Sequence, residues 1–185
     1  MDNKSQKLIT HETQVIFETV YEGKQGVGII ENGVYRFVEG SLAQYFAYNE
    51  AHFVTNLAVA KRLAKDILGS SYAAPYIFLD MVWVPIQIYN RSVILYIALH
   101  HIERVDSVSK YETLVDLRYG VRLKLDVSRG SLCTKLLVSC FLKVLLDGRK
   151  QFLGGIGHVR SDDCEIVKEQ GSVYYTKKRQ KLDDE

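Results

Sequence analysis

The clearest alternation of hydrophobic and polar side chains lies in the segment 121–127. Every second residue there is apolar and the residues between them are polar, which is typical of a strand with one buried face. The strand-like segment 113–119 and Gly120 come directly before it, so we expect the two segments to form a hairpin around that glycine. The apolar positions of the second strand are Val121, Leu123, Leu125 and Val127.

Further strands are predicted on both sides of this hairpin. Short β-branched and aromatic segments at 27–30 and 34–38 flank Asn32-Gly33, a dipeptide that favours the tight turn of a hairpin. The segment 14–21 alternates in the manner of a strand, and two strand-like segments, 85–89 and 92–105, are separated by Asn90-Arg91.

Two segments follow the period of a helix instead. Apolar residues between 42 and 68 fall on one helical face, and Gly69 is a natural residue to end that helix. A second helix is expected to begin at Ser128 or Ser131 and to end near Leu146, where Asp147-Gly148 would stop it. A polar stripe at four-residue spacing is expected on its exposed side. The stripe consists of Lys135, Ser139 and Lys143.

These elements predict an α+β protein with a single domain, in which a small mixed or antiparallel sheet is combined with two main helices. The domain is expected to span residues 1–150. Residues 151–185 begin with glycines, are rich in charge and end in KKRQKLDDE. We predict that they form a flexible tail.

Composition agrees with an ordinary globular protein of the cytoplasm. The 185 residues are 47% hydrophobic and 25% charged, with two prolines, values close to the averages for folded domains. The polar N-terminus does not suggest a signal peptide, and the apolar segments are far shorter than the roughly 20 residues of a membrane helix. Three cysteines without short metal-type spacing suit a reducing compartment. They are Cys133, Cys140 and Cys164.

Charge is distributed unevenly along the chain. Residues 51–150 carry fourteen basic and eight acidic side chains, whereas residues 1–50 carry four and seven, and residues 151–185 carry six and seven. A positive middle between mildly negative ends attracts polyanions. A solvated surface that is merely rich in lysine and arginine would show the same balance.

Catalytic and metal sites are poorly supported. Gly69–Ala73 contains Ser70 and Ser71, but a helix precedes it, whereas a nucleophile elbow needs a strand there. His100 and His101 are neighbours in a predicted strand, so their side chains are expected on opposite faces and not around one metal. Cys133 and Cys140 are better explained as small core residues. We therefore predict no catalytic residue, metal or cofactor.

The basic side chains of the middle segment predict a DNA-binding surface. Cations on a hairpin and on an adjacent helix can follow a phosphate backbone, and arginine can enter a narrow minor groove. Lys61, Arg62 and Lys65 add to the same charge from the first helix. The predicted DNA-binding residues are Arg91, Arg104, Arg118, Arg122, Lys124, Arg129, Lys135 and Lys143.

The chain resembles the ComK family of bacterial competence transcription factors. The resemblance runs from about Arg62 to Leu146 and is carried by GSSYA, PIQIYNRSVILYI, HHI and VDLRYGVRLKLDVSRGSL, in that order. It implies a DNA-binding activator that acts as paired dimers at A·T-rich sites, mainly from the minor groove. It also implies control by proteolysis through an adaptor. Ala74-Pro75 stands where the family commonly has a glycine-arginine pair.

Two functional interpretations follow. The first is a cytoplasmic, nucleoid-associated regulator that binds double-stranded DNA as a homodimer or higher oligomer. The second is a ComK-like interaction protein that has lost DNA binding and acts by dimerisation or by contact with an adaptor. A hydrolase that uses Ser70 or Ser71 with His100 or His101 is a third, supported only by residue identity.

Overall fold

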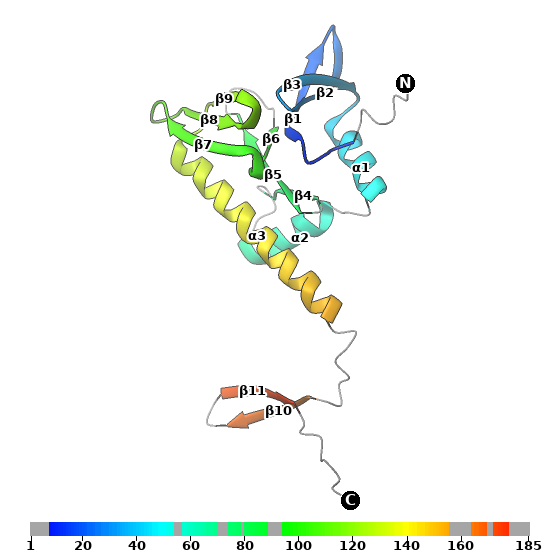
Figure 1. Ribbon diagram of the computed structural model, residues 1–185, viewed down its shortest axis with the longest axis vertical. Coiled ribbons are helices and arrows are strands. Elements are labelled where there is room, and N and C mark those ends of the chain that lie inside the picture. The colour runs from blue at the N-terminus through cyan, green and yellow to red at the C-terminus, as the bar shows by residue number, and fades with distance from the viewer. Residues whose placement is uncertain are drawn as a thin grey trace, which may run out of the picture. The chain divides into compact units, whose positions relative to one another are not determined.

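The computed structural model describes residues 8–53, 57–69, 74–78, 80–88, 94–155, 164–169 and 172–177. The chain divides into two compact units, residues 1–144 and 145–185. The described part of the first unit combines helices with a six-stranded and a three-stranded antiparallel sheet (Figure 1). This confirms the predicted α+β class. The described residues form three α-helices, these two sheets and a further two-stranded sheet, where the sequence pattern indicated two main helices and one small sheet.

The larger sheet is built mainly from hairpins. Its strand order is β3-β2-β1-β6-β5-β4, with every neighbouring pair antiparallel. Glu22-Gly23 and Asn32-Gly33 have positive φ angles, which two-residue hairpin turns require, so the turn predicted at Asn32-Gly33 is confirmed. The strands are β1 (Thr13–Tyr21), β2 (Lys24–Glu31), β3 (Val34–Glu39), β4 (Tyr76–Phe78), β5 (Met81–Gln87) and β6 (Ile94–Ala98).

The core of this unit is aromatic. Trp83 is fully buried and its indole N–H donates to the carbonyl oxygen of Thr13 at 3.2 Å. On one side Pro85 pairs with Tyr96 of β6, whereas on the other side the short strand β4 pairs only with Met81–Trp83, so a residue without an N–H is tolerated there. Strand β5 begins at Met81, before the predicted segment 85–89, and ends within that segment at Gln87.

Two helices occupy the segment in which the pattern predicted one helical face. Helix α1 (Leu42–Phe53) begins with a capping box, in which the backbone N–H of Ser41 donates to Gln44 and the N–H of Gln44 donates to the Ser41 hydroxyl. Helix α2 (Leu57–Leu68) follows. Phe46 of α1 stacks on Tyr76 of β4 with ring centroids 4.3 Å apart, which attaches the helix to the sheet.

The smaller sheet contains the predicted hairpin. Its order is β7-β8-β9, with β7 (Ile102–Ser107), β8 (Thr113–Leu117) and β9 (Arg122–Leu125). The 3₁₀ turn η3 (Arg118–Gly120) joins β8 to β9, so the hairpin around Gly120 is confirmed. The prediction of one strand over 92–105 is wrong, because the 3₁₀ turn η2 (Leu99–His101) interrupts it and places β6 and β7 in different sheets.

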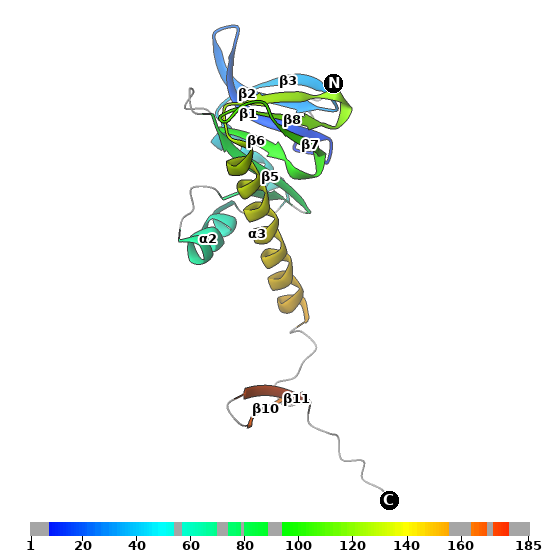
Figure 2. The ribbon, with the colours of Figure 1, turned by 90° about the vertical axis from the view of Figure 1, so that its left-hand side faces the viewer.

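Helix α3 (Arg129–Gly155) is preceded by Ser128, whose hydroxyl accepts the N–H of Ser131, as a cap residue should. The predicted end near Leu146 is wrong, since the helix continues through Gly148. A glycine inside a helix costs only about 1 kcal/mol, which a helix of this length tolerates. Figures 1 and 2 show its first part lying along the outside of the first unit.

The second unit contains the end of α3 and a hairpin of β10 (Cys164–Glu169) and β11 (Ser172–Lys177). Among the residues that the structure describes, no helix combines the length and apolar character needed to cross a membrane.

Candidate nucleic-acid interface

The polar face of the three-stranded sheet carries three of the predicted DNA-binding cations. Antiparallel pairing sets Arg104 and Arg122 opposite Asp116, one on each side, and sets Lys124 opposite Leu114. All three cations are more than half exposed, with side-chain exposures of 70%, 66% and 58%. The structure thus brings them together on one accessible surface, as the alternation in the sequence predicts.

Each of these cations has an acidic neighbour. The Nε atom of Arg122 lies 2.6 Å from Oδ1 of Asp116. The other two pairs join Arg104 to Asp106 and Lys124 to Glu112, at 2.6 and 2.8 Å. Hydrogen bonding to the partner carboxylate raises the pKa of Arg122 and of Lys124. The charges of these three cations and three carboxylates cancel. We call the six side chains the charge-balanced surface. The sequence did not reveal this.

Arg118 lies at the end of the same sheet, on η3, and is exposed. The buried amide of Gln14 donates to the carbonyl oxygen of Arg118 at 2.5 Å and accepts the N–H of Gly33 at 2.7 Å. Tyr119 follows with a φ of 59° and 62% of its surface exposed. A buried side chain therefore fixes the backbone of a turn whose arginine and tyrosine face solvent.

Arg129 is also accessible and stands at the first turn of α3. Its Nε donates to the carbonyl oxygen of Val105 at 3.1 Å, which ties the start of the helix to β7. No carboxylate partner is recorded for Arg118 or Arg129 within the described part of the chain. They are the two predicted cations that are accessible and not matched by an acidic side chain there.

The predicted exposure of Lys135 and Lys143 is wrong. Ser139, between them in the stripe, is 1% exposed, and the side chain of Lys143 is only 14% exposed, with its Nζ 3.7 Å from Oδ1 of Asp80. Burial lowers the pKa of Lys135. The polar stripe faces the protein because Leu132 and Leu142 on the same side are needed in the core.

The two helical cysteines were also misplaced by the sequence pattern. Cys140 is exposed and Cys133 is half-buried, so neither is the small core residue that was predicted. Large apolar side chains share their side of the helix instead: Leu137, Phe141 and Val144 expose 70%, 50% and 66% of their surface.

The histidine pair forms an unexpected cluster. His100 and His101 lie in η2 rather than in a strand, and both Nε2 atoms lie within 3.0 Å of the carbonyl oxygen of His11. The predicted placement on opposite faces is therefore wrong. Burial lowers the pKa of both rings, and Arg118 adds a repulsive positive charge. The described residues contain no group of ligands that suits a metal ion.

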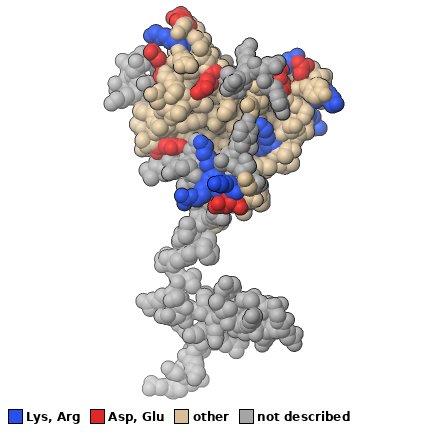
Figure 3. Space-filling view, turned by 180° about the vertical axis from the view of Figure 1, so that it is seen from behind, with Lys and Arg blue, Asp and Glu red and all other residues tan. Residues whose placement is uncertain are grey.

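Charges elsewhere on the first unit are mixed. Helix α2 exposes Lys61, Arg62 and Lys65 beside Asp66. Viewed from behind, basic side chains gather in one patch next to acidic ones at the lower end of the first unit, while other charges are scattered (Figure 3). The cations of α2 form a local group of their own on that helix.

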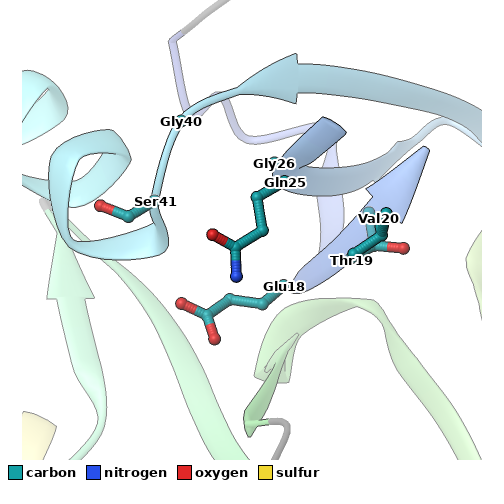
Figure 4. A pocket seen from close by; sticks show the side chains of 7 residues that line it. All are labelled: Glu18, Thr19, Val20, Gln25, Gly26, Gly40 and Ser41. Atoms are coloured by element: carbon teal, nitrogen blue, oxygen red, sulfur yellow. The ribbon is translucent and has the colours of Figure 1, made fainter. Parts of the chain in front are cut away.

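Two cavities have more acidic than basic side chains in their linings, unlike a phosphate-binding site. One, of about 480 Å³, lies between β1, β2 and the start of α1, and Glu18 and Gln25 extend into it (Figure 4). Glu18 is the charged residue of its lining, and a carboxylate repels phosphate. The other, of about 800 Å³, lies beside the start of α3, where Lys110 is outnumbered by Glu112 and Asp126.

Three residues named in the sequence analysis, Arg91, Ser70 and Ser71, lie outside the described residues. The predicted role of Arg91 in DNA binding and the serine hydrolase hypothesis therefore receive no test from the geometry.

Comparison with known proteins identifies the family. The model of the ComK protein family matches residues 4–151, which is most of the chain. No curated protein and no solved structure gives a significant match. The chain belongs to the ComK family.

Proposed function

We propose that this ComK family member is a DNA-binding transcriptional regulator of the competence type, with no catalytic activity of its own. The family match over residues 4–151 is the observation that carries the proposal. The proposed ligand is double-stranded, A·T-rich DNA, approached from the minor groove. The proposal places the protein at the nucleoid in the cytoplasm. DNA binding is assigned to residues 1–150, with 151–185 as a flexible extension.

Arg118 is the side chain that best suits the minor groove. It is exposed on η3, a turn whose backbone Gln14 holds by a hydrogen bond. A narrow minor groove has the most negative potential along a duplex and accepts arginine. Because the turn is already ordered, inserting Arg118 costs less conformational entropy than ordering a loose loop would.

The ion-paired cations are proposed to contact the phosphates on either side of that groove. Exposed ion pairs contribute only about 0.2–1 kcal/mol, so Arg122 can exchange Asp116 for a phosphate at small cost. Lys124 can exchange Glu112 in the same way. The carboxylates remain nearby, and they limit non-specific affinity for DNA. Arg104 and Arg129 belong to the same proposal, whereas Lys135 and Lys143 lie on the inner side of α3, where burial leaves them poorly accessible to DNA.

The proposal is tested by fluorescence anisotropy with A·T-rich and G·C-rich duplexes over a range of salt. Replacing Arg122 and Lys124 by Ala should weaken binding and lower the salt slope by about one unit for each lost phosphate contact. Arg118→Ala should in addition reduce the preference for A·T-rich DNA. Lys24→Ala is the matched control, since Lys24 is an exposed lysine paired with Glu39 in the other sheet. If the wild-type chain does not bind duplex DNA, the proposal is wrong.

The charge-balanced surface supports one alternative, an interaction protein of the ComK type without DNA binding. A surface with three cations and three carboxylates binds a polyanion less strongly than a purely basic one. Affinity capture from cell extract with and without nuclease separates the two functions. Partners that persist after DNA digestion favour the alternative, and partners that disappear favour the regulator.

A further inference from the structure

Strand β3 forms one edge of the six-stranded sheet (Figure 1). It pairs with β2, and no described strand pairs with its other side. The N–H of Gly40 donates to the carbonyl oxygen of Gln25 in β2 at 3.4 Å. Because hydrogen-bonding direction alternates along an antiparallel strand, the backbone groups of Tyr35, Phe37 and Glu39 point away from β2. These N–H and C=O groups are available to pair with an added strand.

This edge lacks the features that usually protect an exposed strand. Proline, a β-bulge, unpaired charge or a very short strand normally prevents pairing with another chain. β3 has six residues, VYRFVE, without proline, and its register with β2 has no bulge. Its two charged side chains, Arg36 and Glu39, each form an ion pair with a residue of β2, Glu31 and Lys24. The edge is therefore a suitable template for β-strand addition.

The two faces of β3 differ in chemistry. One face presents a valine on either side of Arg36. The other presents Tyr35, Phe37 and Glu39, and Tyr35 exposes 45% of its surface. The ring of Phe37 lies across Gly26 of β2, where a Cβ would collide with it. Aromatic rings attract cations, and β-branched side chains pair well with valine across strands. A guest strand that alternates cationic and β-branched residues therefore fits both faces.

The charge around β3 favours a cationic guest. Residues 11–41 carry five glutamates against one lysine and one arginine. At the end of β3, Glu39 is the charged residue in the lining of a cavity of about 350 Å³, which Tyr48 of α1 also lines. A cationic side chain in this cavity meets the Glu39 carboxylate, whose exposed pair with Lys24 is weak enough to exchange. The same excess of carboxylates repels nucleic acid, and a second copy of the chain would carry it too.

We propose that the outer edge of β3 binds a basic, extended segment of another protein by β-strand addition. The backbone of the segment pairs with Tyr35, Phe37 and Glu39, its cations lie on the aromatic side, and its β-branched residues lie beside the valines. This inference goes beyond the proposed function and does not depend on it, because the DNA-binding cations belong to the other sheet. The contact is small compared with standard interfaces, and we expect a dissociation constant of roughly 10–100 µM.

Titration of the full chain with the acetylated and amidated peptide KVKVKVK tests the proposal, with EVEVEVE as the charge-reversed control. In the presence of the lysine peptide, amide hydrogen exchange measured by NMR should slow at Tyr35, Phe37 and Glu39. Arg36 and Val38, whose amides already face β2, should not change. Equal effects of the two peptides, or no added protection at these three amides, would overturn the proposal. Protection that grows with protein concentration in the absence of peptide would also contradict it, because it would show pairing between copies.

Two substitutions at one position separate backbone pairing from the loss of a side chain. Tyr35→Pro removes an outward N–H that β2 does not use, whereas Tyr35→Thr removes the same ring and keeps the N–H. The proline variant should bind the lysine peptide about tenfold more weakly than the threonine variant. Equal binding by these two variants, each with the circular dichroism spectrum of the wild type, would exclude strand addition.

A charge variant tests the cationic guest separately. Glu39→Gln should weaken binding of the lysine peptide about threefold. Glu22→Gln is the matched control, since Glu22 is an exposed glutamate in the β1–β2 turn, away from the edge; it should bind normally. Normal binding by Glu39→Gln would contradict the proposed guest, even if the proline variant does not fold.

Discussion

The imidazole rings of His100 and His101 lie with their centroids 4.4 Å apart, and both Nε2 atoms donate to one acceptor, the carbonyl oxygen of His11. A carbonyl oxygen only accepts, so each ring carries a proton on Nε2, and burial, which lowers the pKa of both rings, favours their neutral form. Their Nδ1 atoms are buried and have no hydrogen-bond partner among the described residues. The rings of His11, Trp83 and Tyr119 and the charge of Arg118 surround the pair. A proton added at either Nδ1 would thus be buried beside positive charge.

Stability should fall as the pH is lowered from 7.5 to 5.5. Because the folded protein lowers the pKa of His100 and His101, the unfolded chain takes up protons first, beginning near its ordinary pKa of about 6.5. The stabilisation by the neutral pair is complete above that pH and is lost below it. Urea unfolding at the two pH values measures the loss. The double variant His100→Gln, His101→Gln should show a smaller pH dependence than His52→Gln, which lies on α1 outside the cluster. Equal pH dependence in these two variants would contradict this explanation.

Replacing Gly33 by Ala should destabilise the protein more than replacing Gly23 by Ala. Both glycines have a φ near +77°, which costs alanine about 1 kcal/mol, so the strain of the turn is matched. A Cβ at Gly33 would lie 3.1 Å from the carbonyl oxygen of Tyr119, whereas a Cβ at Gly23 would meet nothing within 4 Å. The free energy of unfolding should differ by about 1 kcal/mol between the two variants. An equal loss would mean that η3 moves aside without cost.

Gln14→Ala should loosen the contact between the two sheets. The variant removes the amide that joins Gly33 to Arg118 and leaves two backbone groups without this partner. We expect a loss of about 2 kcal/mol in the free energy of unfolding. Amide hydrogen exchange should increase at Gly33, while Ile29, in the middle of β2, keeps its protection. Unchanged exchange at Gly33 would show that the hydrogen bond contributes little.

Asp116→Asn should strengthen binding to duplex DNA. The change removes the carboxylate 2.6 Å from Arg122 and leaves the cation available to phosphate. Affinity should rise about threefold to fivefold at low salt, with a smaller gain at high salt because of screening. Anisotropy titrations at two salt concentrations measure the gain, with Glu39→Gln, from the Lys24 pair of the other sheet, as the control. Weaker binding by Asp116→Asn would show that the pair positions Arg122 for DNA.

Local patterns predicted the elements that depend on near neighbours. The hairpin around Gly120 and the turn at Asn32-Gly33 depend on alternation and turn residues within about fifteen positions, and both are correct. The break at Leu99–His101 was missed because the apolar residues on either side continue like one strand. Strand β4 was missed because three residues carry too little periodicity to predict a strand.

The sequence by itself determined the α+β class, the family and the presence of cations on the hairpin that ends at Val127. Only the tertiary structure decided which side chains pair with those cations and which face of α3 is buried. The cross-strand register sets Arg122 against Asp116, a neutralisation that a count of charges along the chain does not show. A local pattern also could not predict which face of α3 is buried, because apolar side chains occur on both sides of that helix. A period of 3.6 residues says which side chains share a face, but packing against distant strands decides which face is buried. That choice turned Lys143 inward and left Leu137 exposed to solvent.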